Sequence, residues 1–196
     1  MDKYASFAEL SRDAPDDSWR IVERQTQSGV LVIAPHGGEI EVGTSELAAS
    51  IAGDEHNLYC FEGLRVHGFR ELHVTSHRFD EPRALALAGK AAILVGIHGC
   101  KGHGAIYVGG LDDELVTLLT VGLCAAGFRA HSHDHTFPAL HPQNICNRSL
   151  RGVGAQLELT IDLRSAQHRT RIADSVRAVI AVHYRRVLIP ANAAAQ

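Results

Sequence analysis

The sequence lacks the features of several protein classes. It has one tryptophan, one methionine and no apolar run near the ~20 residues that a membrane-spanning helix requires. Its four cysteines are widely spaced, without a CxxC pair or a framework pattern, so reduced and mostly buried thiols are expected. The net charge of −3 gives no electrostatic reason to expect nucleic acid or an anionic membrane as a partner.

The amino-terminal segment MDKYASFAELSRDAPDDSWR is polar and acidic, and no basic region followed by an apolar run is visible. It therefore predicts no signal peptide and synthesis in the cytoplasm, with release on lysis as a route to the outside. The length of 196 residues fits one domain, 1–196, with residues 1–18 as an arm or short helix. We expect a monomer, because no zipper or apolar helix face is evident.

Strand and helix patterns alternate along the chain. Strands are predicted at 19–25, 30–35, 58–61, 71–75, 91–97, 105–108, 128–131 and 154–161. Helices are predicted at 44–52, 80–89, 111–126 and 166–187. This order predicts a single-domain, layered α/β fold with a mixed, mainly parallel central sheet flanked by helices. In such sheets the chemistry gathers just beyond the carboxyl ends of the strands.

Histidine is unusually frequent for its type, with 13 copies, and two of them follow predicted interior strands. His36 comes directly after VLVIAP and is followed by two glycines and by Glu39 and Glu41. His98 comes directly after AAILVGI. A histidine and a nearby glutamate can both ligate zinc, and the spacing leaves Glu39 and Glu41 as alternatives. Two histidines and one glutamate leave a fourth tetrahedral position open for water, which is typical of a catalytic zinc.

Two further segments carry candidate functional residues. Glu158 lies in the predicted strand GAQLELTI between two leucines. A carboxylate among apolar neighbours should have a raised pKa, which suits a general base, although the alternation equally fits a side chain that faces solvent. In NICNR, Arg148 beside Asn147 can clamp a substrate carboxylate, or it can be a solvated loop arginine.

The run His131, His133, Asp134 and His135 looks like a metal cluster. It differs by one missing residue from the His-x-His-x-Asp-His run of the metallo-β-lactamase fold. A solvent-facing, histidine-rich loop is the favoured interpretation, and a contact with substrate is the second.

Six runs together resemble the phage-type poly-γ-glutamate hydrolase family, a compact relative of the zinc carboxypeptidase A superfamily. In order from about residue 30 to residue 160, they are APHGGEIEVGTSEL, LHVTSHRFDEP, GIHGCKG, VGGLDDEL, NICNR and GAQLEL. The resemblance implies a zinc carboxypeptidase-like fold, with zinc held by His36, Glu41 and His98. It implies Glu158 as the catalytic glutamate, and it selects Glu41 over Glu39 because the family pattern is His-x4-Glu.

The resemblance also implies a polyanionic or γ-glutamyl substrate, small or polymeric. Asn147 and Arg148 match the family's substrate loop, and Lys101 adds a cation near the predicted site. His73, in the HVTS run, is a candidate for supporting the metal ligands. We therefore expect a zinc-dependent hydrolase of γ-glutamyl amide linkages. The alternatives are a zinc amidase for another amide, such as a cell-wall γ-linked peptide, and a catalytically silent metal-binding protein that uses the loop histidines.

Overall fold

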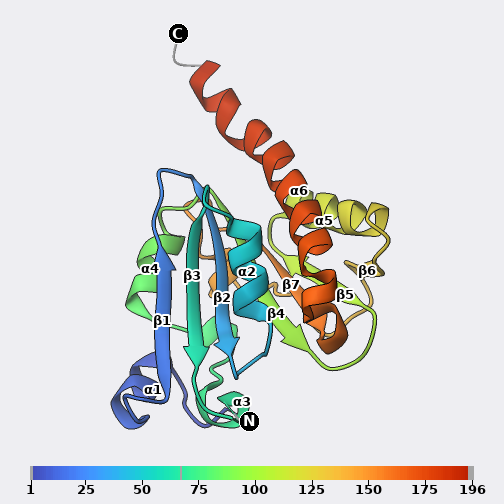
Figure 1. The fold of residues 1–196 in the computed structure, drawn as a ribbon. Coiled ribbons are helices and arrows are strands. Elements are labelled where there is room, and N and C mark those ends of the chain that lie inside the picture. Colours follow the sequence, from blue (N-terminus) through green and yellow to red (C-terminus); the bar gives the residue numbers. More distant parts are fainter. Residues whose placement is uncertain (1, 67, 194–196) are drawn as a thin grey trace.

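The computed structural model describes residues 2–66 and 68–193. Within these residues, seven strands form one sheet in the order β1-β3-β2-β4-β7-β5-β6 (Figure 1). The strands are β1 (Trp19–Arg24), β2 (Val30–Gly38), β3 (Asn57–Gly63), β4 (Ile93–Cys100), β5 (Ile106–Gly110), β6 (Ala130–His131) and β7 (Ala155–Thr160).

The middle of the sheet is parallel. β2 pairs in parallel with β3 and β4, and β4 pairs in parallel with β7. β1 runs antiparallel to β3, and β5 runs antiparallel to β7 while pairing in parallel with β6. The prediction of a mixed, mainly parallel sheet is therefore confirmed, and the carboxyl ends of β2, β4 and β7 meet at one edge of the sheet.

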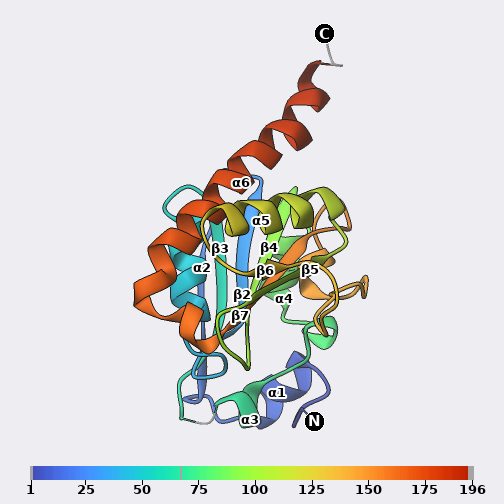
Figure 2. The ribbon, with the colours of Figure 1, turned by 90° about the vertical axis from the view of Figure 1, so that its right-hand side faces the viewer.

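Helices cover both faces of the sheet (Figures 1 and 2). The helices are α1 (Phe7–Asp13), α2 (Thr44–Ala52), α3 (Gly68–Leu72), α4 (Pro82–Ala88), α5 (Asp113–Ala125) and α6 (Ala166–Ala193), with 3-10 turns η1 (Ser76–Arg78), η2 (Ile145–Asn147) and η3 (Ile161–Arg164). Side chains of β2 alternate between two cores, as the strand period requires. Val30 and Val32 pack with α2, α5 and α6, whereas Leu31 and Ile33 pack with α1 and α4.

The long helix α6 continues past the predicted end at residue 187, and its carboxyl-terminal half projects beyond the sheet (Figure 1). Among the described residues, no helix combines the length and the apolar character that crossing a membrane requires.

The predicted strand at 71–75 is wrong. The chain forms the short helix α3 up to Leu72 and then an irregular segment before η1. Leu72 and Val74 are buried, and the exposed or half-buried residues between and around them produced the alternating pattern. Here the alternation reflects packing of single side chains into the core, without the neighbouring strand that a sheet needs.

Candidate metal centre and active site

Three side chains converge where β2 and β4 end. His36 lies near the end of β2, within an irregularity between Ala34 and Gly37, and His98 lies in β4. Glu41 lies in the turn between β2 and α2. All three are buried, and their potential ligand atoms lie within 4.8 Å of one another. Adjacent parallel strands thus place the two histidines side by side, as the rule for α/β sheets predicts.

The tight turn after His36 aims Glu41 back at the histidine. The amide of Glu41 donates to the carbonyl of His36 at 2.9 Å, and Gly43 has φ of 92°, which favours glycine. Glu39 is exposed, whereas one carboxylate oxygen of Glu41 lies 3.2 Å from His36 Nδ1. The geometry therefore favours Glu41 of the two glutamates that the spacing left open.

The arrangement of acceptor atoms fits a bound cation. His36 Nε2 lies 2.8 Å from the carbonyl of Val74, so this nitrogen is the donor and Nδ1 of the neutral ring carries a lone pair. That Nδ1 faces His98 Nδ1 at 3.2 Å and the Glu41 carboxylate at 3.2 Å. Two ring nitrogens and a carboxylate oxygen directed at one another are the donor set of a catalytic zinc site. The residues present therefore fit the metal that the sequence implies.

The pKa values of this group point the same way. Burial alone would lower the pKa of His36, but the charge of Glu41 and the bond to Val74 raise it above its ordinary value. Burial would likewise raise the pKa of Glu41, but His36 and His98 hold it far below the ordinary range. The buried Glu41 carboxylate and a proton on the histidines thus stabilise each other. A metal cation bound at these side chains would supply the positive charge in place of that proton.

Glu158 stands beside this group on the same face of the sheet. The register pairs His98 of β4 with Glu158 of β7, and Glu158 with Tyr107 of β5, so all three project to one side. Burial raises the pKa of Glu158 to about 7, with Glu41 raising it further and His98 lowering it. Of the two interpretations left open for Glu158, the structure favours a partly buried carboxylate next to the histidines over a solvent-facing one.

Sequence reasoning missed the residue that holds Glu158. Gln156 Nε2 donates to Glu158 Oε1 at 3.3 Å, and the side-chain Oε1 of Gln156 accepts from Asn144 Nδ2 at 3.2 Å. Both amides are buried. The i, i+2 spacing of Gln156 and Glu158 on one strand face was the available signal.

The predicted substrate residues differ in their exposure. Lys101 is exposed immediately after β4, and Arg148 is exposed as the C-cap of η2. Asn147 is buried, and its side chain donates to the carbonyls of Ala139 and His141. In this structure Asn147 therefore braces the loop that carries Arg148.

The HVTS segment packs directly against the candidate ligands. The ring of His73 lies 4.1 Å from that of His36, and its Nε2 is 3.9 Å from Glu41. The neighbouring Val74 supplies the carbonyl that orients His36. Such contacts fix the tautomer and orientation of metal-binding histidines.

The carboxylate of Asp2 secures this segment. Its carboxylate accepts from the Thr75 amide at 2.8 Å, the Thr75 hydroxyl at 2.6 Å and Arg78 at 2.7 Å, and it contacts His73 Nδ1 at 2.8 Å. Burial opposes these bonds, but together they lower the pKa of Asp2 to about 2. No pattern in the sequence reveals this contact, because more than 70 residues separate Asp2 from Thr75.

Asp2→Asn is therefore expected to destabilise the protein at neutral pH by about 2 kcal/mol. The folded-state pKa of Asp2 lies below its ordinary value, so this stabilisation is complete above about pH 4 and is lost as the pH falls toward 2. Urea unfolding at pH 7 and at pH 2 measures the difference, with the exposed Asp54→Asn as the matched control. A loss that is the same size at both pH values would contradict the assignment to the Asp2 charge.

The histidine-rich loop does not gather a comparable set. In the part of the chain that the structure describes, His36, Glu41 and His98 are the one group of three or more potential ligands within reach of one another. His131 and His135 instead lie against the ring of Tyr107, at 6.0 and 5.4 Å between centroids. These contacts favour a loop that borders the sheet face carrying Glu158.

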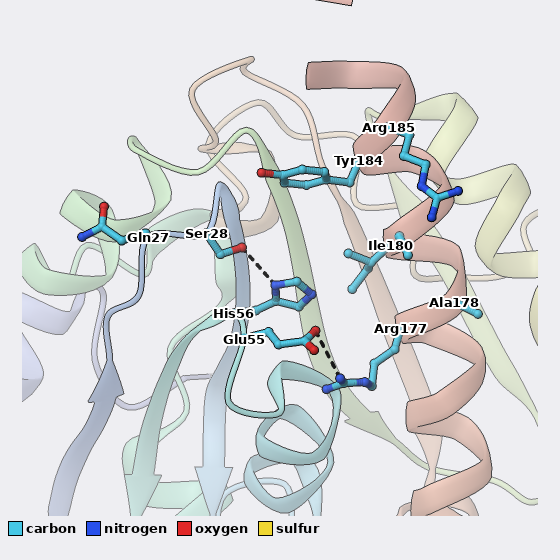
Figure 3. A pocket seen from close by; sticks show the side chains of 10 residues that line it. Gln27, Ser28, Glu55, His56, Arg177, Ala178, Ile180, Tyr184 and Arg185 are labelled. Carbon is cyan, nitrogen blue, oxygen red and sulfur yellow. Dashed lines mark hydrogen bonds and ion pairs between the residues drawn. The ribbon is translucent and has the colours of Figure 1, made fainter. Parts of the chain in front are cut away.

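A cavity of about 630 Å³ lies far from this edge, at the amino ends of β2 and β3 (Figure 3). Ser28 and His56 form one wall, and Arg177 and Tyr184 of α6 form the other. Four of its polar residues are paired with one another, since His56 Nδ1 is 2.9 Å from Ser28 Oγ and Arg177 is 3.3 Å from Glu55.

Comparisons with known proteins give a family match over most of the chain. Residues 4–183 match a family described as Poly-gamma-glutamate hydrolase. The SPbeta prophage-derived protein YoqZ of Bacillus subtilis is 41% identical over 174 residues, which are 86% of this chain and 62% of YoqZ. The chain thus spans less than two thirds of that curated relative.

Solved structures give the same picture. A bacteriophage poly-gamma-glutamate hydrolase superposes with a TM-score of 0.88 at 32% identity, covering 94% of this chain and 99% of that one. A zinc-free form of YndL also gives 0.88, at 33% identity over 94% of this chain and 100% of that one. A Pseudomonas aeruginosa metallo-carboxypeptidase matches with a TM-score of 0.53 at 15% identity, covering 86% of this chain and 61% of that one. This distant likeness shows the fold alone, and it confirms the expected carboxypeptidase-like architecture.

Proposed function

Because the chain belongs to the poly-gamma-glutamate hydrolase family, we propose that it is a zinc-dependent hydrolase of γ-glutamyl amide linkages. The observation that carries the proposal is the convergence of the His36, Glu41 and His98 acceptor atoms beside the partly buried carboxylate of Glu158. The family makes a metal-dependent hydrolase the general class. The choice of zinc is supported by the two-histidine, one-glutamate donor set and by the zinc-free description of the YndL structure.

In the proposed reaction each side chain has one role. When bound, zinc would act as a Lewis acid toward the scissile carbonyl and would activate water. Glu158 accepts a proton from the attacking water and returns it to the leaving amine, because a carboxylate with a pKa near 7 can do both. Gln156 holds the Glu158 carboxylate in place through its amide. Arg148 binds a substrate carboxylate from the rim.

The purified protein is expected to contain about one zinc ion per chain and to cleave poly-γ-glutamate. A chelator should abolish cleavage, and zinc added afterwards should restore it. Elemental analysis and the change in polymer size measure the two quantities. Zinc without cleavage would redirect the search to other amides, such as cell-wall γ-linked peptides. Cleavage that is unaffected by full metal removal would contradict the proposed mechanism.

A further inference from the structure

A second cavity, of about 430 Å³, opens beside Glu41 at the carboxyl end of β4. Val42, Phe69 and Ile161 line it, and each of these apolar side chains is more than half exposed, at 53%, 53% and 58%. Large apolar side chains gathered around one hollow mark a binding site more often than scattered ones do. The volume lies within the usual range for small-molecule sites. The cavity therefore offers apolar contacts next to the candidate metal centre.

The buried cation in the wall is the guanidinium of Arg164, in η3. Arg164 is 8% exposed and packs over Gly99, where a Cβ atom would collide with the guanidinium. Its Nη1 donates to the carbonyl of Val42 at 2.7 Å, while its Nε is buried without a hydrogen-bond partner among the described residues. A guanidinium has five donors in a fixed fork, so most of this one's capacity is unused. Carboxylates are the groups that this fork matches best.

The carboxylate that shares the cavity does not occupy this guanidinium. Glu41 accepts from the Gly99 amide at 2.7 Å and directs its other oxygen at His36. As a proposed metal ligand, Glu41 would bind the metal through its carboxylate. The guanidinium of Arg164 is then available to bind an incoming anion. Lys101, exposed on the rim, adds a second positive charge to the same opening.

We propose that this cavity is a subsite for an acidic substrate unit, in which Arg164 binds the carboxylate and Val42, Phe69 and Ile161 contact the aliphatic part. The inference rests on the proposed function and specifies the substrate chemistry of the same site. Every unit of a γ-linked glutamate chain carries a free carboxylate on a short aliphatic segment. Units on both sides of the cut bond therefore need a cation, and Arg164 supplies one in addition to Arg148.

The test uses two small probes of similar shape, the dicarboxylate glutarate and its neutral diamide, glutaramide. Calorimetric titration of the zinc-loaded wild type should show glutarate binding at least about tenfold more tightly than glutaramide. Arg164→Met should weaken glutarate binding at least about tenfold, and Lys101→Met about two- to fivefold, because its charge is exposed. Lys90→Met, an exposed lysine just before β4, is the matched control and should change nothing.

A further variant separates the cavity from the metal and from folding. Ile161→Trp fills the opening with a bulky group at an exposed position, so it should block glutarate while leaving zinc content and the unfolding midpoint unchanged. If Arg164→Met fails to fold, Ile161→Trp still tests whether this cavity binds glutarate. Equal affinity for the two probes would overturn the subsite. Glutarate affinity that survives Ile161→Trp would also overturn it, since the probe would then be bound by the metal alone.

The same measurements distinguish the subsite from the proposed reaction. If the wild type binds glutarate in this pattern but does not cleave poly-γ-glutamate, the acidic subsite is supported and the proposed polymer reaction is contradicted. If the wild type cleaves the polymer in a zinc-dependent manner but binds glutaramide and glutarate equally well, the proposed reaction is supported and the subsite is contradicted.

Discussion

Glu158→Gln is expected to retain zinc and to lose turnover of γ-glutamyl substrate by about 10²- to 10⁴-fold. The amide cannot accept the proton of the attacking water, but it has the shape of the carboxylate and can still accept the hydrogen bond from Gln156. Because the substitution leaves His36, Glu41 and His98 untouched, zinc content and substrate KM should stay close to the wild type. Initial rates over a range of substrate concentrations, beside metal analysis, measure all three quantities.

The matched control is Glu23→Gln, an exposed strand glutamate on the edge strand β1. It should have wild-type kinetics, since β1 and β7 are separated by three strands of the sheet. Turnover of Glu158→Gln within about tenfold of the wild type would remove Glu158 from the role of general base. Loss of zinc in the same variant would instead indicate that Glu158 takes part in holding the metal.

Much of the layout of this site was predictable because the positions of His36 and His98 follow from the strands before them. VLVIAP and AAILVGI are continuous apolar runs, so each predicts a buried strand that stops at a histidine. Two such strands in one parallel sheet end at the same edge, which brings the side chains together without any knowledge of the loops. The proximity of His36 and His98 in the structure follows from this pattern.

The choice between Glu39 and Glu41 did not follow from the spacing, because it depends on a turn. The turn is set by hydrogen bonds from the Glu41 amide to the His36 carbonyl and from the Glu39 amide to the Gly63 carbonyl of β3. The second of these bonds joins segments that are far apart in the sequence. The resemblance to a family, rather than the local pattern, gave the choice that this geometry favours.

Arg164 and Asp2 were missed as parts of the site for related reasons. Arg164 reads as an ordinary basic residue before a helix, and its burial depends on Gly99 leaving room for the guanidinium. Asp2 acts through the irregular segment after α3, which the alternation of Leu72 and Val74 had predicted as a strand. Contacts between irregular segments carry no periodicity, so a single sequence does not disclose them.

His98→Ala is expected to weaken zinc binding by more than about 100-fold, since even residues that only support a metal ligand contribute 10- to 100-fold. Turnover should fall with zinc occupancy. The zinc-dependent part of the stability should also disappear, which is about 3–4 kcal/mol at free zinc between 100 and 1,000 times the dissociation constant. A thermal melt with and without zinc measures this effect independently of activity, because the wild type should shift and the variant should not.

The matched control, His133→Ala, tests the remaining alternative, in which the loop histidines bind the metal. His133 lies in the histidine-rich loop, and the one group of three or more potential ligands among the described residues does not include it. It should bind zinc as the wild type does and show the same thermal shift. Zinc retained in His98→Ala and lost in His133→Ala would move the metal to the loop and leave a metal-binding protein without the proposed reaction. The opposite pattern would place the metal at His36 and His98, whose Nδ1 atoms lie 3.2 Å apart. Glu158, the proposed general base, is the register partner of His98 and would lie beside that metal.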